Sequence, residues 1–233
     1  MAPLSITWLG HSTFLITTPG GKRIVTDPWL EGNPMCPPDR KKIDKADLIL
    51  LSHGHSDHSG SIVPVSRATN APIVVIHELS LWLERKGLHN VKGMGIGGTQ
   101  TVAGLEISMT PAVHSSSVVE NDAIVYLGEP TGFVVRLEDG RAFYFAGDTA
   151  LFTDMKLIGE TYSPEIAFLP IGDHYTMGPD AASRACQLLG VRQVVPMHYG
   201  TFPILTGTPE RLKHLVEPFG VDVLVLKPGE TAQ

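Results

Sequence analysis

The chain has 233 residues, of which 42% are hydrophobic and 18% are charged, and it has a formal net charge of −6 and a pI near 5.9. This acidic balance argues against a general nucleic-acid binder and against an anionic membrane surface as partner, because both usually require a basic face. No apolar run approaches the ~18 residues of a membrane helix, no signal-peptide pattern opens the chain, and two cysteines, Cys36 and Cys186, are too few for a disulfide framework. We therefore expect a soluble, cytoplasmic protein.

The first part of the chain is expected to open with a meander of three short strands and to continue with alternating strands and helices. The strands of the meander are residues 4–9, 13–17 and 23–26, and the last one ends at Asp27-Pro28. A long loop rich in Pro and Gly, residues 29–39, follows, and loops of this length are often functional. Next come a buried strand at 48–51, a helix at 59–69, a strand at 72–76 and a helix at 78–86.

The second part repeats this order, with a β-rich stretch before strand and helix pairs. Residues 91–111 are mostly β, 115–121 form a polar loop, and strands at 132–137 and 142–145 enclose a turn. Helices are expected at 151–158, 179–189 and 209–216, and strands at 165–169, 193–196 and 221–226. The pattern predicts an α/β fold in which residues 1–233 form one domain, with two mixed sheets face to face and helices outside.

Residues 47–58, DLILLSHGHSDH, combine a buried strand with a dense cluster of metal-binding side chains. The apolar run 48–51 is followed within seven residues by three imidazoles and one carboxylate: His53, His55, Asp57 and His58. Imidazole nitrogen and carboxylate oxygen are ligands that divalent transition metals bind in proteins. The stretch therefore predicts a metal site at the edge of a sheet.

Three further strands end in a candidate ligand, namely His114, Asp148 and His198. Strand ends in α/β folds converge where loops build binding sites, so one shared site is expected. Seven ligands exceed the needs of one tetrahedral ion but suit two ions, and a carboxylate such as Asp148 has two oxygens with which to bridge them. His53 and His55 can point to one ion, and Asp57 and His58 to the other.

In these motifs the chain resembles the metallo-β-lactamase superfamily. The resemblance rests on H-x-H-x-D-H at residues 53–58, the later His114, Asp148 and His198, and the early Asp motif Thr26-Asp27-Pro28. Segments such as WLGHSTFLI, GIGGT, VHSSS, AGDTALFTDMKLIGE, LPIGDHYTMGP and VPMHYGTFP are similar to a prokaryotic branch of metal-dependent hydrolases related to L-ascorbate-6-phosphate lactonase. The resemblance covers the whole chain and implies a four-layer αβ/βα sandwich with the metals at one edge.

The resemblance also implies how the site is divided. It assigns His53, His55 and His114 to the first metal, Asp57, His58 and His198 to the second, and Asp148 to both. Asp27 would accept a hydrogen bond from a liganding ring. The expected cofactors are two divalent ions, Zn first, with Mn or Fe also compatible with all-His/Asp ligation.

A divalent ion lowers the pKa of bound water toward ~7, so a metal-bound hydroxide is the expected nucleophile. The expected function is hydrolysis of a small ester or lactone, with or without a phosphate group. Asp57 could also accept a proton, and His11 and His174, each at a strand end, could bind substrate, donate a proton or line the pocket.

Three other functions stay open. A phosphodiesterase or nuclease of the same superfamily is disfavoured by the acidic chain. Di-iron redox members resemble H-x-E-x-D-H, whereas residue 55 is His in this chain. A non-catalytic metal-binding protein would not need the complete ligand set. A small-molecule substrate is the expected partner, and homo-oligomerisation is left open.

Overall fold

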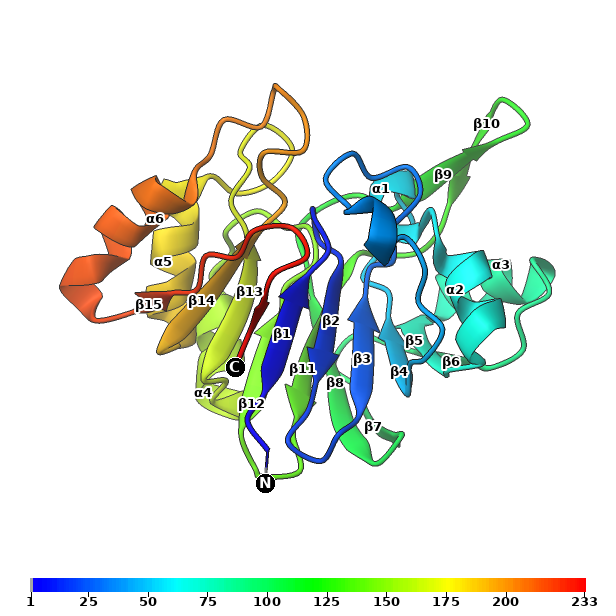
Figure 1. Cartoon of the computed structure of the whole chain (residues 1–233), viewed down its shortest axis with the longest axis horizontal. Helices are drawn as coiled ribbons and strands as arrows, with labels where there is room; N and C mark the ends of the chain where they lie inside the picture. Colours follow the sequence, from blue (N-terminus) through cyan, green and yellow to red (C-terminus); the bar gives the residue numbers. More distant parts are fainter. Residues whose placement is uncertain (1) are drawn as a thin grey trace.

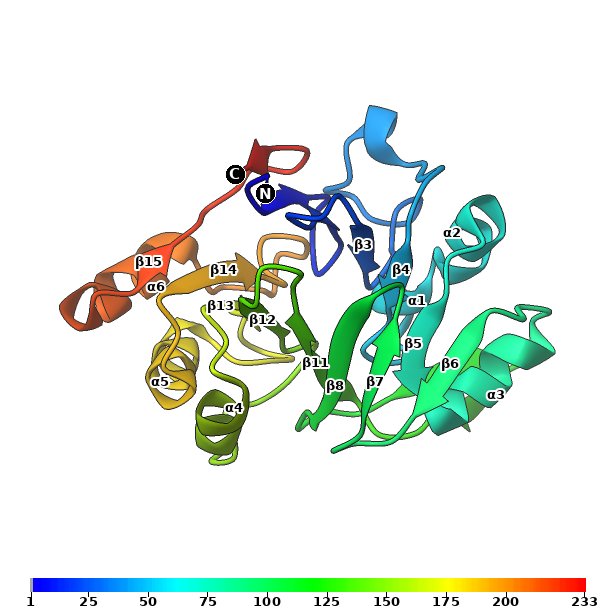
Figure 2. The ribbon, with the colours of Figure 1, turned by 90° about the horizontal axis from the view of Figure 1, so that it is seen from below.

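The computed structural model describes residues 2–233 and contains two seven-stranded sheets packed face to face (Figures 1 and 2). In the first sheet β1 (Ser5–Trp8), β2 (Phe14–Thr17) and β3 (Arg23–Thr26) form an antiparallel meander. β4 (Leu48–Leu50), β5 (Ile73–Ile76) and β6 (Val91–Met94) continue it in parallel. β16 (Thr231–Ala232) pairs with β1, so the end of the chain closes this edge of the sheet.

The second sheet has the order β15-β14-β13-β12-β11-β8-β7. Its antiparallel half consists of β7 (Thr99–Val102), β8 (Leu105–Pro111), β11 (Thr131–Arg136) and β12 (Ala142–Phe145). Its parallel half adds β13 (Ile166–Pro170), β14 (Gln193–Met197) and the short β15 (Asp222–Val223). The parallel strands are joined through helices, as a parallel connection requires.

Helices cover the outer faces of both sheets (Figure 2). α2 (Ile62–Thr69) and α3 (His77–Arg85) follow β4 and β5, while α4 (Met155–Tyr162), α5 (Pro179–Leu189) and α6 (Pro209–Val216) lie against the second sheet. α5 and α6 each begin with a proline in the first turn, and α5 ends at Gly190 in the left-handed region. Single 3-10 turns occupy Pro38–Arg40 and Glu217–Phe219.

The main core lies between the sheets and is built from the inward faces of their strands. In β2, Phe14 and Ile16 are buried while Leu15 and Thr17 between them are half-buried, which is the alternation of a strand with one face on the core. The rings of Phe14 on β2 and Phe168 on β13 meet edge to face at 5.0 Å and join the two sheets. A second core cluster lies between the second sheet and α4, α5 and α6. The expected sandwich of two mixed sheets with helices outside is confirmed.

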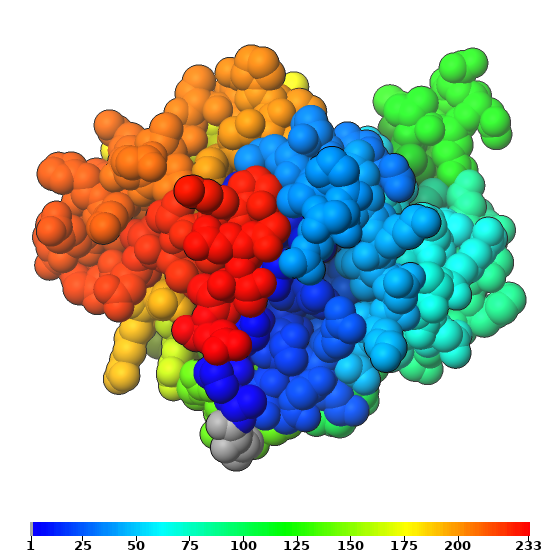
Figure 3. Space-filling model, viewed as in Figure 1, coloured from blue at the N-terminus to red at the C-terminus, as the bar shows by residue number. Residues whose placement is uncertain are grey.

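Several expected boundaries were wrong. Residues 115–121, expected as a polar loop, belong to a two-stranded hairpin of β9 (Ser117–Glu120) and β10 (Ala123–Tyr126), which projects from the body (Figure 3). Asn121 and Asp122 have φ of 51° and 61°, the conformation of a two-residue hairpin turn that Asn and Asp tolerate. The helix expected at 59–69 is divided at Gly60-Ser61 into α1 (Ser56–Ser59) and α2.

Two other differences concern ends. The helix expected from residue 151 begins at Met155, and the strand expected at 221–226 is only two residues long. Within residues 2–233, no helix combines the length and hydrophobicity needed to cross a membrane.

Candidate metal centre

The predicted ligands lie in the segments that directly follow strands, and one of these segments contains α1, at the top of the molecule in Figure 1. His53 and His55 follow β4, and Asp57 and His58 lie in α1 directly after them. The other three follow strands of the second sheet: His114 after β8, Asp148 after β12 and His198 after β14. Both sheets therefore contribute side chains to one place.

The first group of candidate ligands consists of His53, His55 and His114. One ring nitrogen from each lies within 4.8 Å of the others, which is close enough for all three to bind one ion. Nε2 of His53 is 3.0 Å from Nδ1 of His55, so these two rings converge even though only Gly54 separates them in the chain. This is the set expected for the first metal.

The second group is His11, Asp57, His58 and His198, whose ligand atoms also lie within 4.8 Å of one another. Three of these residues were expected together. His11 is the addition, because the sequence marked it only as a residue that could line the pocket or move a proton.

Asp148 lies between the two groups. Its Oδ2 is 3.2 Å from Nε2 of His58 and 3.0 Å from Nε2 of His198, both in the second group. The same oxygen is 3.6 Å from Nε2 of His114 in the first group. The carboxylate is 2% exposed, so these rings, rather than water, surround it.

The donor set fits divalent metal ions. Within residues 2–233, Nε2 of His58 and Oδ1 of Asp148 are buried without a hydrogen-bond partner, although such atoms are normally paired. Nε2 of His58 lies 3.2 Å from the other oxygen of Asp148, the residue between the two groups. A cluster made only of imidazole nitrogen and carboxylate oxygen suits Zn, Mn or Fe.

Asp27 and Ser52 orient the rings of His58 and His53 through contacts at Nδ1. Nδ1 of His58 donates to Oδ2 of Asp27 at 2.7 Å, which leaves Nε2 of His58 free to bind a metal. Ser52 donates to the same carboxylate through its backbone N–H at 2.7 Å and its hydroxyl at 2.6 Å. The Ser52 hydroxyl is also 2.9 Å from Nδ1 of His53, so one fully buried carboxylate orients a ring in each group.

The charges within the cluster favour a cation. Burial opposes a charge on His58, but Asp148 on one side of the ring and Asp27 on the other raise its pKa well above the ordinary value. Burial acts against ionisation of Asp148, but His198 and His58 outweigh it and hold the pKa of Asp148 well below its usual range. Burial lowers the pKa of His53. The carboxylates on both sides of the His58 ring therefore stabilise a positive charge there.

Three residues of the centre have a left-handed backbone, which is costly for residues other than glycine. They are Asp27, His11 and His198, with φ of 37°, 55° and 55°. The backbone N–H of His198 donates to the carbonyl oxygen of His11 at 3.1 Å, so two of them are joined directly. Backbone strain of this kind is concentrated at functional sites. It persists only where the surrounding structure holds the residue in place.

His11 is completely buried and has a partner on each ring nitrogen. Its Nε2 lies 3.2 Å from Oδ2 of Asp57 and its Nδ1 lies 2.9 Å from the hydroxyl of Thr201. Burial lowers the pKa of His11 to about 4. The edge of the ring also meets Trp29 at 5.2 Å and Phe202 at 5.8 Å between ring centres, so aromatic side chains border the second group.

His174 lies apart from both groups. It is exposed on the loop after β13, and its ring packs edge-on against Tyr175 at 4.4 Å. The same loop is tied to the centre, because a side-chain carbon on Gly172 would collide with the carbonyl of His198. His174 therefore stands near the metal edge but outside the candidate metal-binding groups.

The contacts of Ser52 with His53 and of Thr201 with His11 were not predicted from the sequence. Ser52 directly precedes the first His of the motif, and this adjacency was the available signal. Thr201 contacts a residue 190 positions away, for which the sequence offers no signal.

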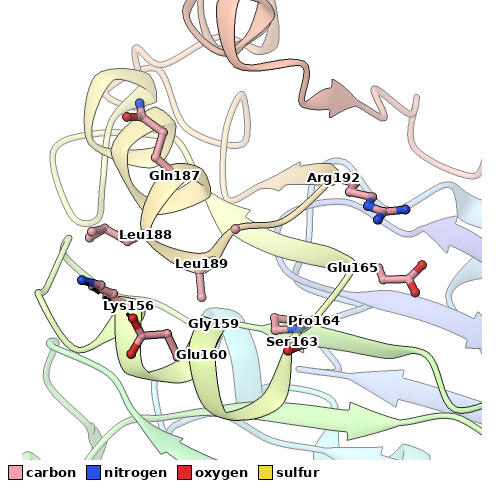
Figure 4. Close-up of a pocket in the computed structure, with 11 residues that line it drawn as sticks. Lys156, Gly159, Glu160, Ser163, Pro164, Glu165, Gln187, Leu188, Leu189 and Arg192 are labelled. Carbon is pink, nitrogen blue, oxygen red and sulfur yellow. Dashed lines mark ion pairs between the residues drawn. The ribbon is translucent and has the colours of Figure 1, made fainter.

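A groove with a volume of about 660 Å³ lies elsewhere, between α4 and the C-terminal end of α5 (Figure 4). Lys156 and Glu160 from α4, Gln187 from α5, and Glu165 and Arg192 from the adjoining loops border it. None of the candidate ligands lines this groove. The candidate reaction centre is therefore the metal cluster, which the loops at the strand ends enclose.

The chain is similar to known metal-dependent hydrolases. Residues 22–199 match the family described as "Beta-lactamase superfamily domain". The chain is 47% identical over 228 residues to a UPF0173 metal-dependent hydrolase of Koribacter versatilis, covering 98% of this chain and 97% of the relative. It is 48% identical to one from Rubrobacter xylanophilus, covering 97% and 94%. The solved structure of Igni18, a metallo hydrolase from Ignicoccus hospitalis, is similar with 40% identity and a TM-score of 0.86, covering 98% and 97% of the two chains.

Proposed function

Because this chain belongs to the UPF0173 family of metal-dependent hydrolases within the beta-lactamase superfamily, we propose that it binds two divalent ions and hydrolyses a small ester or lactone. The first ion would be held by His53, His55 and His114, and the second by Asp57, His58 and His198, with Asp148 between them. Zn is the metal we propose, and Mn or Fe would suit the same ligands.

The position of Asp148 carries the proposal for two ions. One oxygen of this carboxylate lies within 3.6 Å of ring nitrogens from both groups, and its other oxygen is buried without a partner among residues 2–233. A single ion in one group would leave the ring nitrogens of the other group without a cation. Two ions would use both oxygens and the free nitrogens of the surrounding rings.

Bound divalent ions supply Lewis acidity and lower the pKa of water toward ~7. The protein residues set the geometry in which that chemistry occurs. Asp27 and Ser52 keep Nδ1 of His58 and of His53 in hydrogen bonds, so that the Nε2 atoms of these rings would be available to the ions. Asp57 is half-buried beside His11 and is the carboxylate we assign to accept a proton during hydrolysis.

The proposed substrate class rests on the resemblance of the sequence motifs to the branch related to L-ascorbate-6-phosphate lactonase. A lactone or ester, with or without a phosphate, needs only a polarised carbonyl and an activated water. His174 is exposed at the metal edge, and we assign it to substrate contact rather than metal binding. Trp29 and Phe202, beside His11, would border the bound substrate.

The test combines metal analysis with a substrate screen. Wild type, Asp148→Ala and the matched control Asp154→Ala, which alters an exposed carboxylate outside both metal groups, are purified with excess metal and desalted. We expect two ions per chain in wild type and control, fewer in Asp148→Ala, and hydrolysis of a lactone or carboxylic ester that Asp148→Ala loses.

Other outcomes decide against parts of the proposal. One ion per chain in metal-replete wild type contradicts the dinuclear centre. Turnover of bis(p-nitrophenyl) phosphate without turnover of any lactone or ester replaces the substrate class with a phosphodiester. Two bound ions without hydrolysis of any class tested would favour a metal-binding role.

A further inference from the structure

We propose that the hydroxyl of Thr201 positions Asp57 for the second metal ion, acting through the ring of His11. This inference rests on the proposed dinuclear centre and extends it to a residue that lies outside every candidate ligand group. Thr201, His11 and Asp57 are far apart in the sequence, and the fold places them in one hydrogen-bonded line.

The chemistry of the three groups sets the direction of the line. A carboxylate only accepts hydrogen bonds, so the contact of 3.2 Å between Asp57 and His11 requires the proton on Nε2 of the ring. The neutral ring then has a lone pair on Nδ1. The Thr201 hydroxyl, 2.9 Å away, is the group that can donate to it.

The hydrogen bond between Thr201 and His11 is buried. His11 is fully buried and Thr201 is 9% exposed, so bulk water does not compete with the bond between them. The alternative acceptors for the Thr201 hydroxyl are weaker: the sulfur of Met35 at 3.2 Å and the carbonyl of Tyr199 at 3.5 Å. The hydroxyl is therefore best satisfied when it donates to His11.

The backbone adds a second restraint on the same ring. The carbonyl of His11 accepts from Nε1 of Trp8 at 3.0 Å and from the N–H of His198 at 3.1 Å. With its backbone held and both ring nitrogens engaged, His11 has one orientation. Its Nε2–H then donates to Oδ2 of Asp57, so that Oδ1 would be the oxygen available to the second ion.

Thr201 is thus a positioning residue, because it reaches the metal only through two other side chains. Groups that orient metal ligands typically change metal affinity by ~10–100-fold when they are removed, and a more distant group is expected near the lower end of that range. The effect should concern the second ion, since His53, His55 and His114 make no hydrogen bond to this line among residues 2–233.

The experiment compares three substitutions that separate the hydroxyl from the volume of the side chain. Thr201→Val keeps the volume and removes the hydroxyl, Thr201→Ser keeps the hydroxyl, and Thr201→Ala removes both. Thr7→Val is the matched control, because it removes a hydroxyl bonded at 2.8 Å to Thr231, in the strand pair β1–β16 and outside the metal groups. Each protein is stripped of metal and titrated with Co²⁺, with the visible spectrum and the two affinities recorded.

We expect Thr201→Val and Thr201→Ala to bind the second Co²⁺ about tenfold more weakly, with an altered spectrum for that ion, and Thr201→Ser and Thr7→Val to resemble wild type. Affinity that follows side-chain volume, so that Val resembles wild type and Ser does not, overturns the inference. So does an unchanged second affinity in all variants, or an equal loss of both ions.

Wild-type binding of a single Co²⁺ would instead overturn the dinuclear proposal, and this inference with it. Thermal melting of the metal-free proteins shows whether each variant is folded. If Thr201→Val is not, the comparison of Thr201→Ala with Thr201→Ser still isolates the hydroxyl.

Discussion

Replacing Asp27 by Asn should weaken metal binding while preserving the shape of the side chain. The Asp27 carboxylate is completely buried and accepts three hydrogen bonds, two of them on Oδ2. These two come from the Ser52 hydroxyl at 2.6 Å and from Nδ1 of His58 at 2.7 Å. In the Asp27→Asn variant the retained carbonyl can still accept from the backbone N–H of Ser52, but an NH₂ group faces the other two donors.

The structure sets the size of the effect. A hydrogen bond to a charged group contributes ~1.5–3 kcal/mol, so losing two without rearrangement would cost about 3–6 kcal/mol of the free energy of unfolding. His58 can reduce this loss by moving its proton from Nδ1 to Nε2 and accepting from the Asn amide. That proton then occupies the atom that should bind the second ion. We expect ~10–100-fold weaker binding of this ion, which corresponds to about 1.4–2.8 kcal/mol.

The assay is competition between the protein and a chromophoric chelator, with ion content checked by elemental analysis. Asp47→Asn is the matched control, since Asp47 also accepts a backbone N–H, from Arg23 at 2.8 Å, but lies outside the metal groups. An Asp27→Asn protein that is less stable yet binds both ions as tightly as wild type would refute the reasoning about the His58 tautomer.

Three other predictions follow from packing and burial. Gly172→Ala places a methyl group against the carbonyl of His198. We therefore expect a folded protein that loses the second ion before the first in a chelator titration. Equal loss of both ions would contradict this. Phe168→Ala removes the ring that joins the two sheets and should lower the free energy of unfolding in urea by ~3–5 kcal/mol, and a loss below ~1 kcal/mol would show that the contact is dispensable. Burial raises the pKa of Cys36 to about 11 and that of Cys186 to about 12, so both thiols stay protonated at a pH of about 8. Both should therefore react with a disulfide reagent only after unfolding. A fast reaction of the native protein would contradict their burial.

Much of the fold was readable because its strands are short, buried and separated by clear turn residues. β3 and the helices α5 and α6 begin and end where expected. The hairpin β9–β10 was missed because its strands do not pack into the core. Val119 and Ile124, which pair across the hairpin, are apolar but exposed, so the strands lack the pattern of one apolar and one polar face. β16 was missed because its only support is the edge of β1, on the opposite end of the chain.

The candidate ligands could be predicted from their chemistry, whereas the supporting residues Ser52 and Thr201 could not. Imidazole and carboxylate at successive strand ends carry a chemical signature, and the topology brings strand ends together. Thr201 and Ser52 are ordinary hydroxyl residues whose importance comes from the atoms they face in the folded chain. His11 shares features of the ligands and of the supporting residues. As a histidine it was a visible candidate in the sequence, but its position beside Asp57 depends on the left-handed backbone at His11.

The division of the ligands along the chain has a consequence for how the protein is made. About 140 residues separate His58 from His198, and at ~5–20 residues per second a ribosome needs roughly 7–30 s to cover that distance. The three rings of the first group have all been synthesised once residue 114 is added, whereas the second group waits for residue 198. In the proposed dinuclear centre the second ion can therefore bind only after residue 198 has been added, and chains that end before β14 would offer a site for one ion only.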